Sequence, residues 1–394
     1  MKITVPTIDF GTSKIVTMVA QSNGERCDIV GSGAVPYSGY LQDGWNNPDE
    51  IRDVIRTAID QAQKTGNCRI HELNVGVPGM FTRVIVKEVH VSLTGPDPHV
   101  TAQDVRACFK LAEESGGDRI IHSAPAWFRV DDGKKTLSPV GIKGRELSAM
   151  IALVTADKYF IDDITYRLRD MDIEPREFYS TVAGEATYAL SQDERDKTAM
   201  LIDIGYLCTD VMVMEGDALI FHKCLDIGGG HISADIAEQL NIPFPFVEEK
   251  IKQTYSFNST NQDETYVIPA TEDEPARTVR RDEVTPIIEA KVEEIAEAIN
   301  KALEEGGVKL GKWSNVYLTG GGLILNKGGK DFLAGKLHRI IREAQRTNNK
   351  MPSHVFSSAV GLTILVVTTQ EEQKAPEGGA KGLFSRAFRW LMGY

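Results

Sequence analysis

The chain has 394 residues, of which 42% are hydrophobic and 25% charged, so it is long enough for two or more domains with ample cores. Its formal net charge of −12 argues against a broad nucleic-acid-binding surface, and we expect no nucleic acid among its partners. The five cysteines lack CxxC spacing, and no basic-then-apolar signal segment opens the chain. We therefore expect a reduced, intracellular protein without a metal knuckle. A membrane-spanning helix needs a run of about 18 apolar residues, and the sequence has no run of that length.

The first candidate site is the stretch Ile8–Lys14, which lies between two β-type runs and predicts a strand, a tight turn and a second strand. Gly11 allows the backbone to approach a bound group closely, and successive turn N–H groups can form an anion site. Thr12 and Ser13 add hydroxyl donors. Asp9 enters from the strand, where it is a candidate for holding Mg²⁺ through water. Taken alone, the same pattern also fits an ordinary surface hairpin.

Strands forming a meander are predicted up to about residue 40, followed by a helix at Asp49–Lys64 and a strand at Leu73–Pro78. Val84–Val89 is expected to continue the same sheet. A second group of elements follows, which begins with a helix capped by Thr101–Asp104 and continues through several short strands. A helix over about Lys158–Met171 is expected to return the chain to the first sheet.

The pattern of the first turn recurs at Met200–Val211, where an apolar run leads to Asp203, then to Gly205 and to a turn that contains Thr209. Two Asp-Xaa-Gly hairpins, each opening a similar half, suggest a duplicated architecture with a phosphate chain bound between the halves. A strand beginning at Val316 then runs into three glycines, against which a flat base or ribose can lie. These glycines are Gly320, Gly321 and Gly322.

A further glycine-rich turn lies at Leu225–Ala237, where a strand ends and a helix begins. Gly228 and Gly229 are candidates for anion binding there, because the N–H groups at a helix N-terminus favour negative charge. The remaining predicted elements are a hairpin, two helices and a buried apolar run, at 266–279, 283–305, 332–346 and 355–367. Asp282 is expected to cap the first of these two helices.

The segment 371–380 is polar and contains Pro and Gly, which predicts a flexible linker. In the segment 381–394, apolar residues share one helical face and basic residues lie beside it. This pattern is typical of an amphipathic helix on an anionic membrane surface. The residues predicted to contact the membrane are Leu383, Phe384, Arg386, Phe388, Arg389, Trp390 and Leu391. The alternative is a helix docked on the protein's own core.

The two hairpins and the glycine triplet, in this order, resemble the actin-like ATPase superfamily, and the inserted elements and the tail resemble its FtsA family of bacterial cell-division proteins. The resemblance covers nearly the whole chain. It implies an actin-like (RNase H-like) α/β fold of two duplicated domains, with an FtsA-type inserted subdomain and a C-terminal amphipathic helix. Ile8–Lys14 resembles the first phosphate loop, 203–210 the second, and 318–322 the adenosine loop. The implied cofactors are ATP and Mg²⁺, the ion being held through water by Asp9 and Asp203.

The resemblance also implies roles for charged residues outside the loops. Glu249 and Lys252 match a family pair that faces the ribose and base, and their spacing of three places them on one face of a predicted helix. A solvated charged helix is the equal alternative. Glu185 lies on a helix of small residues at Ser180–Leu190, which is expected to pack closely against a neighbouring helix. It is either a candidate for reaching the water at the γ-phosphate or a solvated glutamate.

By the same resemblance, the first domain is expected at 1–88, 170–198 and 347–370, and the inserted subdomain at 89–169. The second domain is expected at 199–235 and 306–346, and a small subdomain at 236–305. The small subdomain is the implied contact for the C-terminal peptide of FtsZ. Its candidate basic residues are Arg277, Arg280 and Arg281, each of which is equally compatible with a merely solvated side chain.

The second loop departs from the family pattern Asp-Ile-Gly-Gly-Gly-Thr. Tyr206, Leu207 and Cys208 stand where two glycines and a threonine are usual, so two side chains are added and a hydroxyl becomes a weakly donating thiol. We therefore expect weakened nucleotide binding and at most slow ATP hydrolysis.

The implied function is a cell-division adaptor at the cytoplasmic face of the cell membrane, which polymerises and tethers FtsZ filaments at the division site. The alternatives are a pilus-assembly platform protein related to FtsA, and an ATPase or a sugar or acetate kinase of the same superfamily. A kinase has little use for an amphipathic tail, and the pilus relative usually lacks it.

Overall fold

The structure is a computed structural model that describes residues 3–24, 26–41, 44–117, 119–261, 263–270, 275–311, 314–344 and 353–373. The chain forms two compact units. The first comprises Met1–Ala199, Met212–His222 and Gln345–Tyr394, and the second comprises Met200–Val211 and Lys223–Ala344.

The first unit is built around a five-stranded sheet with the order β10-β6-β1-β2-β3. Its strands are β1 (Ile3–Phe10), β2 (Lys14–Ser22), β3 (Cys27–Pro36), β6 (Glu72–Val77) and β10 (Glu174–Ser180). The first three form an antiparallel meander, as predicted, whereas β6 and β10 run parallel to β1. A small hairpin of β4 (Tyr40–Leu41) and β5 (Gly44–Trp45) lies between β3 and the first helix.

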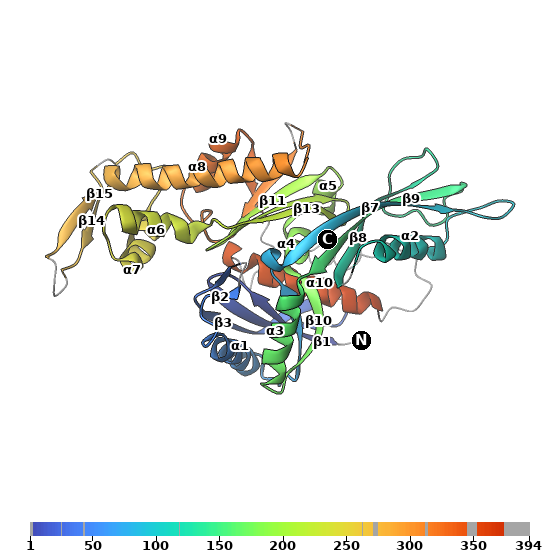
Figure 1. Cartoon of the computed structure of the whole chain (residues 1–394), viewed down its shortest axis with the longest axis horizontal. Coiled ribbons are helices and arrows are strands. Elements are labelled where there is room, and N and C mark those ends of the chain that lie inside the picture. Colours follow the sequence, from blue (N-terminus) through green and yellow to red (C-terminus); the bar gives the residue numbers. More distant parts are fainter. Residues whose placement is uncertain are drawn as a thin grey trace. The chain divides into compact units, whose positions relative to one another are not determined.

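Helices cover both faces of this sheet (Figure 1). Ile8 and Phe10 face a core shared with α1 (Ile51–Gly66) and α3 (Lys158–Arg169), while Val5 faces α10 (Ser357–Gln373) on the other side. This alternation follows from the two-residue period of a strand, and because both faces are covered, β1 and β2 are buried at nearly every position. The shorter helices of this unit are η1 (Gly79–Phe81), α4 (Thr181–Ala189), α5 (Gln192–Arg195) and η3 (His354–Phe356).

The inserted subdomain has its own three-stranded sheet, with the order β7-β9-β8. The elements are β7 (Thr82–Ser92), α2 (Ala102–Glu114), β8 (Ile120–Val130) and β9 (Glu146–Ala156). As predicted, Thr101 caps α2 in a capping box with Asp104. The expectation that Val84–Val89 continues the first sheet is wrong, because β7 pairs with β9 along its whole length. The predicted subdomain limits also differ, since β7 begins at Thr82 and α3 packs in the core of the first sheet.

The second sheet has the order β13-β12-β11-β16-β17, the same succession of a meander and two added strands as in the first. Its strands are β11 (Ala199–Ile204), β12 (Thr209–Glu215), β13 (Ala218–Leu225), β16 (Asn315–Thr319) and β17 (Ile341–Glu343). The repeat confirms the duplicated architecture. The helix predicted over 332–346 is wrong in extent, since α9 spans Gly329–Leu337. His338 then takes a left-handed conformation (φ 53°), and β17 pairs with β16.

In the second unit, a long helix follows a small hairpin (Figure 1). The elements are α6 (Gly229–Gln239), α7 (Phe244–Phe246), the π-helix η2 (Val247–Lys252), β14 (Thr265–Ile268), β15 (Arg277–Arg280) and α8 (Arg281–Glu305). The predicted hairpin is confirmed. Asp282 is not the cap of α8, because it lies inside the first turn and the Glu283 carboxylate accepts from the Arg280 N–H.

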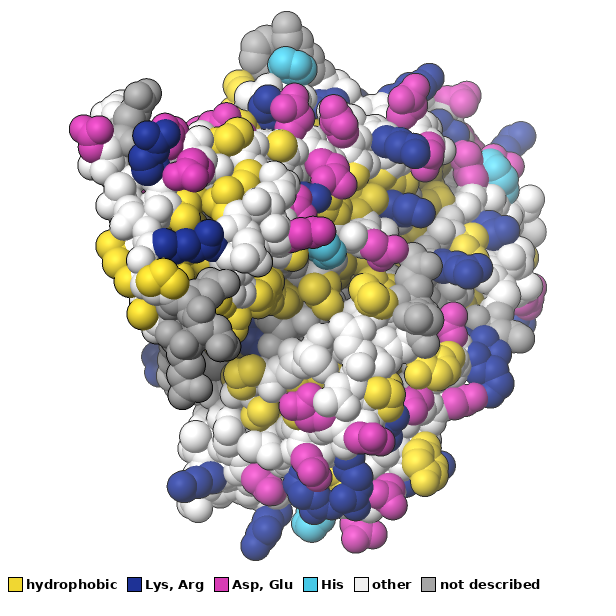
Figure 2. Space-filling view, turned by 60° about the vertical axis from the view of Figure 1, so that its left-hand side comes forward, with side chains coloured by type: hydrophobic (Ala, Val, Ile, Leu, Met, Phe, Trp, Pro, Cys, Tyr) yellow, Lys and Arg dark blue, Asp and Glu magenta, His cyan; other side chains and the backbone are white. Residues whose placement is uncertain are grey.

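Helix α10 continues to Gln373, so the first three residues of the predicted linker are helical. The predicted membrane helix at 381–394 lies outside the described residues. Among the residues that the structure describes, no helix has the length and apolarity needed to cross a membrane. On the face shown in Figure 2, acidic and basic side chains are interspersed.

A buried arginine fastens the β12–β13 turn within the first unit. Arg195 is fully buried, and its guanidinium donates to the carbonyls of Gly216 (3.0 Å) and Leu190 (2.7 Å). It also pairs with Asp217 at 3.1 Å. The same turn contacts the inserted subdomain, since the Asp217 N–H donates to the Pro125 carbonyl of β8. The turn therefore depends on a cation that water does not reach.

Replacement of Arg195 by Ala leaves the mostly buried Asp217 carboxylate without its cation, and we expect it to lower the free energy of unfolding by about 3–5 kcal/mol. The matched control is Arg52→Ala, which removes an ion pair of 2.7 Å to Asp170 between two half-exposed side chains. That change should cost about 1 kcal/mol or less. Urea unfolding followed by circular dichroism measures both, and equal losses would contradict the structural role of Arg195.

Candidate functional site

The predicted strand, turn and strand at the first loop are confirmed. Gly11 N–H donates to the Lys14 carbonyl (3.0 Å) and closes the β1–β2 turn. Two neighbouring tyrosines hold the turn, because the Tyr40 hydroxyl donates to Phe10 O (2.7 Å) and the Tyr37 N–H to Ser13 O (3.1 Å). Of the other predicted loop residues, Thr12 is buried, and the Lys14 ammonium lies 5.3 Å from the centre of the Phe356 ring.

Asp9 is buried at the end of β1, with only 4% of its surface exposed. The Ser358 hydroxyl of α10 donates to its Oδ2 at 2.7 Å. Burial raises the pKa of the Asp9 carboxyl, and this hydroxyl and nearby Lys14 oppose the shift only in part. The carboxyl is therefore held in place by Ser358 of α10, and its charged form is less favoured than that of an exposed aspartate.

Glu185 lies where α4 and α10 pack backbone against backbone. A Cβ on Gly361 would lie 2.6 Å from Glu185 Cα, and one on Gly184 would lie 2.9 Å from the Gly361 carbonyl. The prediction that this helix of small residues lies close to a neighbour is confirmed. Glu185 itself is only 1% exposed, so the alternative of a solvated helix glutamate is wrong.

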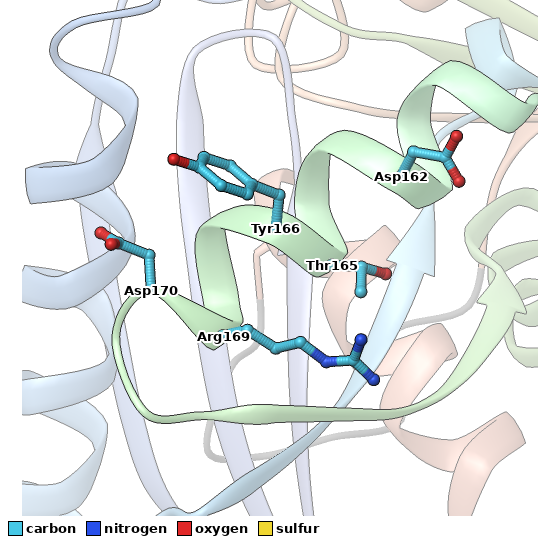
Figure 3. Close-up of a pocket in the computed structure, with 5 residues that line it drawn as sticks. All are labelled: Asp162, Thr165, Tyr166, Arg169 and Asp170. Carbon is cyan, nitrogen blue, oxygen red and sulfur yellow. The ribbon is translucent and has the colours of Figure 1, made fainter.

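The surface of α3 carries a shallow depression lined by Asp162, Thr165, Tyr166, Arg169 and Asp170 (Figure 3). Its charged groups are engaged in ion pairs with neighbours: Asp162 with Lys158, Arg169 with Glu174, and Asp170 with Arg52. This arrangement is typical of an ion-paired surface.

In the second unit, glycines of three segments bring their backbones into close contact. A Cβ on Gly229 would lie 2.4 Å from Gly322 Cα, and one on Gly322 would lie 2.3 Å from the Gly205 carbonyl. Gly320 has φ +86°, and a Cβ there would lie 2.0 Å from an Asp203 carboxylate oxygen. The second loop, the start of α6 and the glycine triplet, all predicted from sequence, therefore come together within this unit.

The first backbone donors of α6 serve this packing. Gly229 N–H donates to Gly205 O (2.9 Å) and Gly230 N–H to Tyr206 O (2.7 Å). Gly228 N–H donates to the His231 ring nitrogen Nδ1 at 3.0 Å. These groups hold the second loop against the helix, so phosphate contacts at Gly228 and Gly229 rest on the family resemblance alone.

Lys252 is a buried cation beside these loops. Its ammonium lies 3.2 Å from Glu248 Oε1 and 5.7 Å from the centre of the Tyr206 ring. Glu248 in turn accepts from the Ser233 hydroxyl of α6 at 2.5 Å. Burial lowers the pKa of Lys252, which the Glu248 carboxylate partly offsets.

Glu249, the predicted partner of Lys252, is exposed instead. The reason is that Val247–Lys252 forms a π-helix, in which more residues complete a turn and a spacing of four aligns better than three. Sequence reasoning missed Glu248, although a Glu four residues before a Lys was a usable signal. It also missed Asn326, whose side-chain amide donates to Lys252 O (2.6 Å) and Tyr255 O (3.1 Å) and so joins the third loop to the π-helix.

The unusual residues of the second loop have defined surroundings. The Tyr206 ring covers Gly230, where an added Cβ would lie 3.0 Å from ring carbons. Cys208 is buried, and its carbonyl accepts from Gly205 N–H at 2.9 Å to close the turn. The Thr209 hydroxyl, predicted to bind the cofactor, donates to Ile227 O at 2.7 Å and so has a structural partner.

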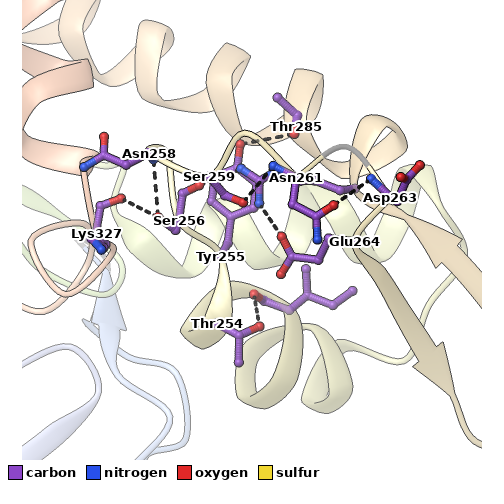
Figure 4. Close-up of polar contacts among 12 residues, drawn as sticks. Thr254, Tyr255, Ser256, Asn258, Ser259, Asn261, Asp263, Glu264, Thr285 and Lys327 are labelled. Carbon is purple, nitrogen blue, oxygen red and sulfur yellow. Dashed lines mark hydrogen bonds and ion pairs between the residues drawn. The ribbon is translucent and has the colours of Figure 1, made fainter.

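Among the basic candidates for the FtsZ contact, Arg281 is buried. It pairs with Glu264 (2.9 Å), donates to Ser256 O (2.6 Å) and lies 4.2 Å from the centre of the Tyr255 ring. Figure 4 shows the surrounding polar contacts that tie this segment together. Arg280 is exposed and pairs with Asp282, and Arg277 donates to the Leu240 carbonyl at 2.7 Å.

Solved structures of low sequence identity share the fold. A chain of the PilM–PilN type IV pilus biogenesis complex is 17% identical, with 93% of this chain and 99% of that chain covered and a TM-score of 0.61. MreB5 of Spiroplasma citri bound to AMPPNP is 11% identical, with coverages of 94% and 98% and a TM-score of 0.55. The fold is therefore actin-like.

The sequence itself is similar to one family throughout. A family model described as "Cell division protein FtsA" matches residues 200–361, and one described as "SHS2 domain inserted in FTSA" matches 79–155, close to the observed limits of β7 to β9. FtsA of Pseudomonas aeruginosa is 24% identical over 98% of this chain and 97% of its own length. FtsA of Bacillus subtilis is 26% identical over 76% and 70%. The chain belongs to the FtsA family of actin-like cell-division proteins.

Proposed function

We propose that this protein is an ATP-binding adaptor of bacterial cell division, which polymerises and tethers FtsZ filaments to the cytoplasmic face of the cell membrane at the division site. The observation that carries the proposal is the match of two FtsA-specific family models, one of them to the inserted subdomain. Contact with FtsZ, self-association and location follow from membership of the family. The pilus-platform alternative is not favoured, because the likeness to PilM is one of fold. The kinase alternative is not favoured, because both family models that match are those of FtsA.

Nucleotide binding is supported by the chemistry of each unit. MreB5, a fold neighbour, was solved with AMPPNP and with ADP. In the second unit, the buried ammonium of Lys252 lies beside the second loop, 5.7 Å from the Tyr206 ring, and its positive charge suits a phosphate. Asp9 and Asp203 are the acceptors that would hold Mg²⁺ through water, and the ion would neutralise phosphate charge. Glu185 is the candidate for orienting a water.

The FtsZ contact is proposed for the segment 236–305. Arg281 is excluded as a peptide-binding residue because its guanidinium is buried among Glu264, Ser256 and Tyr255. Arg280 is the remaining exposed candidate. Its side chain pairs with Asp282 and Glu283, in the first turn of α8. Such surface pairs are weak, so an acidic peptide can compete for it.

Membrane attachment is proposed for residues 381–394. A buried large apolar side chain contributes up to about 1.5–3 kcal/mol, and each basic residue near anionic lipid adds about 1 kcal/mol. Ordering a short helix offsets much of this gain. The expected attachment is reversible, and polymerisation would strengthen it through multivalency.

The first test concerns Asp9. Asp9→Asn keeps the shape of the side chain and a partner for Ser358 but removes the charge that accepts from water on Mg²⁺. We expect ATP affinity with Mg²⁺ to fall about tenfold, about 1.4 kcal/mol, by calorimetry. Because the pKa of Asp9 is raised, affinity of the parent should fall as the pH is lowered and Asp9 takes up a proton, whereas the variant should lose this dependence. Equal affinities and equal pH profiles would reject the assignment; Asp60→Asn, at an exposed position of α1, is the control.

The second test concerns the unusual second loop. Replacing Tyr206, Leu207 and Cys208 by Gly, Gly and Thr restores the family pattern and uncovers Lys252, so ATP affinity or turnover should rise. Phosphate release and calorimetry measure both quantities, with Tyr166→Gly at an exposed position of α3 as a control. A parent that already turns over ATP at about 1 per second or faster, a rate ordinary for enzymes, would contradict the idea that these side chains obstruct the nucleotide site.

The third test concerns tethering. Phe388→Glu places a charge within the apolar face of the tail and should abolish sedimentation with anionic liposomes, whereas Phe388→Leu should preserve it. Arg386→Ala should do less, and mainly at low salt. The melting temperature of the body and binding of an FtsZ C-terminal peptide should stay unchanged in all three. Lipid binding by a chain ending at Ala380 would show that the lipid contact lies outside the tail. A lower melting temperature in Phe388→Glu would assign the helix to the core.

A further inference from the structure

Two thiols and a carboxylate gather at one end of the β12–β13 pair in the second unit. Cys208 immediately precedes β12, Asp210 is the second residue of that strand, and Cys224 is the next-to-last residue of β13. The two sulfur atoms and a carboxylate oxygen of Asp210 lie within 4.8 Å of one another. Cys224 hydrogen-bonds to both of the other two.

The fold produces this cluster from residues that the sequence separates. Residues two apart on a strand point to the same face, which places Cys208 and Asp210 side by side. β13 is the neighbour of β12 in the sheet, and it brings Cys224 across from them. Cys208 is buried and the other two side chains are half-buried, so the cluster is shielded on one side and reachable on the other.

We propose that Cys208, Cys224 and Asp210 form a site for a thiophilic divalent cation of the Zn²⁺ class, with a water as fourth ligand. Tetrahedral Zn²⁺ with Zn–S bonds of about 2.3 Å and Zn–O bonds of about 2.0–2.2 Å places its ligand atoms about 3.5–3.8 Å apart. The observed cluster reaches this separation with small side-chain movements. Binding releases one proton from each thiol, so two thiolates and one carboxylate face the ion.

The donor set decides the kind of ion. Thiolate ligands favour Zn²⁺ and disfavour Mg²⁺ and Ca²⁺, which take oxygen ligands. The hydrogen bond to Cys208 and burial raise the pKa of the Cys224 thiol well above its ordinary value, so the ion has to displace a proton there. Metal affinity should therefore rise with pH. A disulfide is the competing fate of two adjacent thiols, and it requires an oxidant.

A bound ion would join the end of the second loop to β13, because Cys208 closes the turn of that loop and Cys224 lies on the neighbouring strand. The site does not rest on the proposed function, since none of its three residues is needed for FtsZ or lipid contact. It is tested without nucleotide.

The experiment uses the full chain, purified with reductant and stripped of metal. Titration with Co²⁺ is followed by absorbance, because a thiolate-bound tetrahedral Co²⁺ gives charge-transfer and d–d bands that an oxygen-bound ion lacks. Zn²⁺ should then displace one Co²⁺ per chain. Cys224→Ser and Cys208→Ser should each weaken Co²⁺ affinity more than about 100-fold, since even an outer-shell partner contributes about 10- to 100-fold. Asp210→Asn should weaken it less.

Cys68→Ser, which removes another half-buried thiol, is the matched control and should bind Co²⁺ like the parent. Melting temperatures of the metal-free variants identify any that fail to fold. Cys208→Ala with a parent-like melting temperature and full Co²⁺ affinity would overturn the proposal. So would a reduced parent that gives no thiolate charge-transfer band, whether or not a Cys208–Cys224 disulfide forms in air.

Discussion

Contact between backbones that carry no side chain is the constraint on which both units depend. In the second unit, Gly229, Gly322 and Gly205 touch at distances that a Cβ would violate by about 1 Å. In the first, Gly184 and Gly361 let α4 and α10 cross in the same way. The glycines thus fix where the loops lie, and the polar groups are arranged around them.

Much of this fold was predictable because its signals are local. The two Asp-Xaa-Gly hairpins lie on strands whose apolar runs are visible in the sequence, and the repeated sheet order follows from that repetition. The capping box at Thr101 and the small-residue helix at Ser180–Leu190 are likewise short-range patterns with a physical cause. The glycine segments were recognisable as site elements because only glycine permits such an approach.

The features that escaped prediction depend on pairing or winding that a single segment does not reveal. The β-type residues of β7 do not say which sheet the strand joins, and only its pairing with β9 decides this. Glu248, rather than Glu249, pairs with Lys252 because the segment winds as a π-helix. β17 forms because His338 ends α9 and turns the chain back toward β16. Cys208 and Cys224 are distant in sequence and meet only once β12 and β13 pair.

The π-helix makes the placement of Lys252 a matter of chain length as much as of side-chain identity. A π-turn can be regarded as an α-helix that has accepted one extra residue. Deleting a single residue from Val247–Lys252 would restore tighter winding and rotate the lysine away from Glu248, although both side chains would still be present. Insertions and deletions at this turn therefore offer evolution a way to retune the charge beside the glycine loops without substituting any residue that forms it.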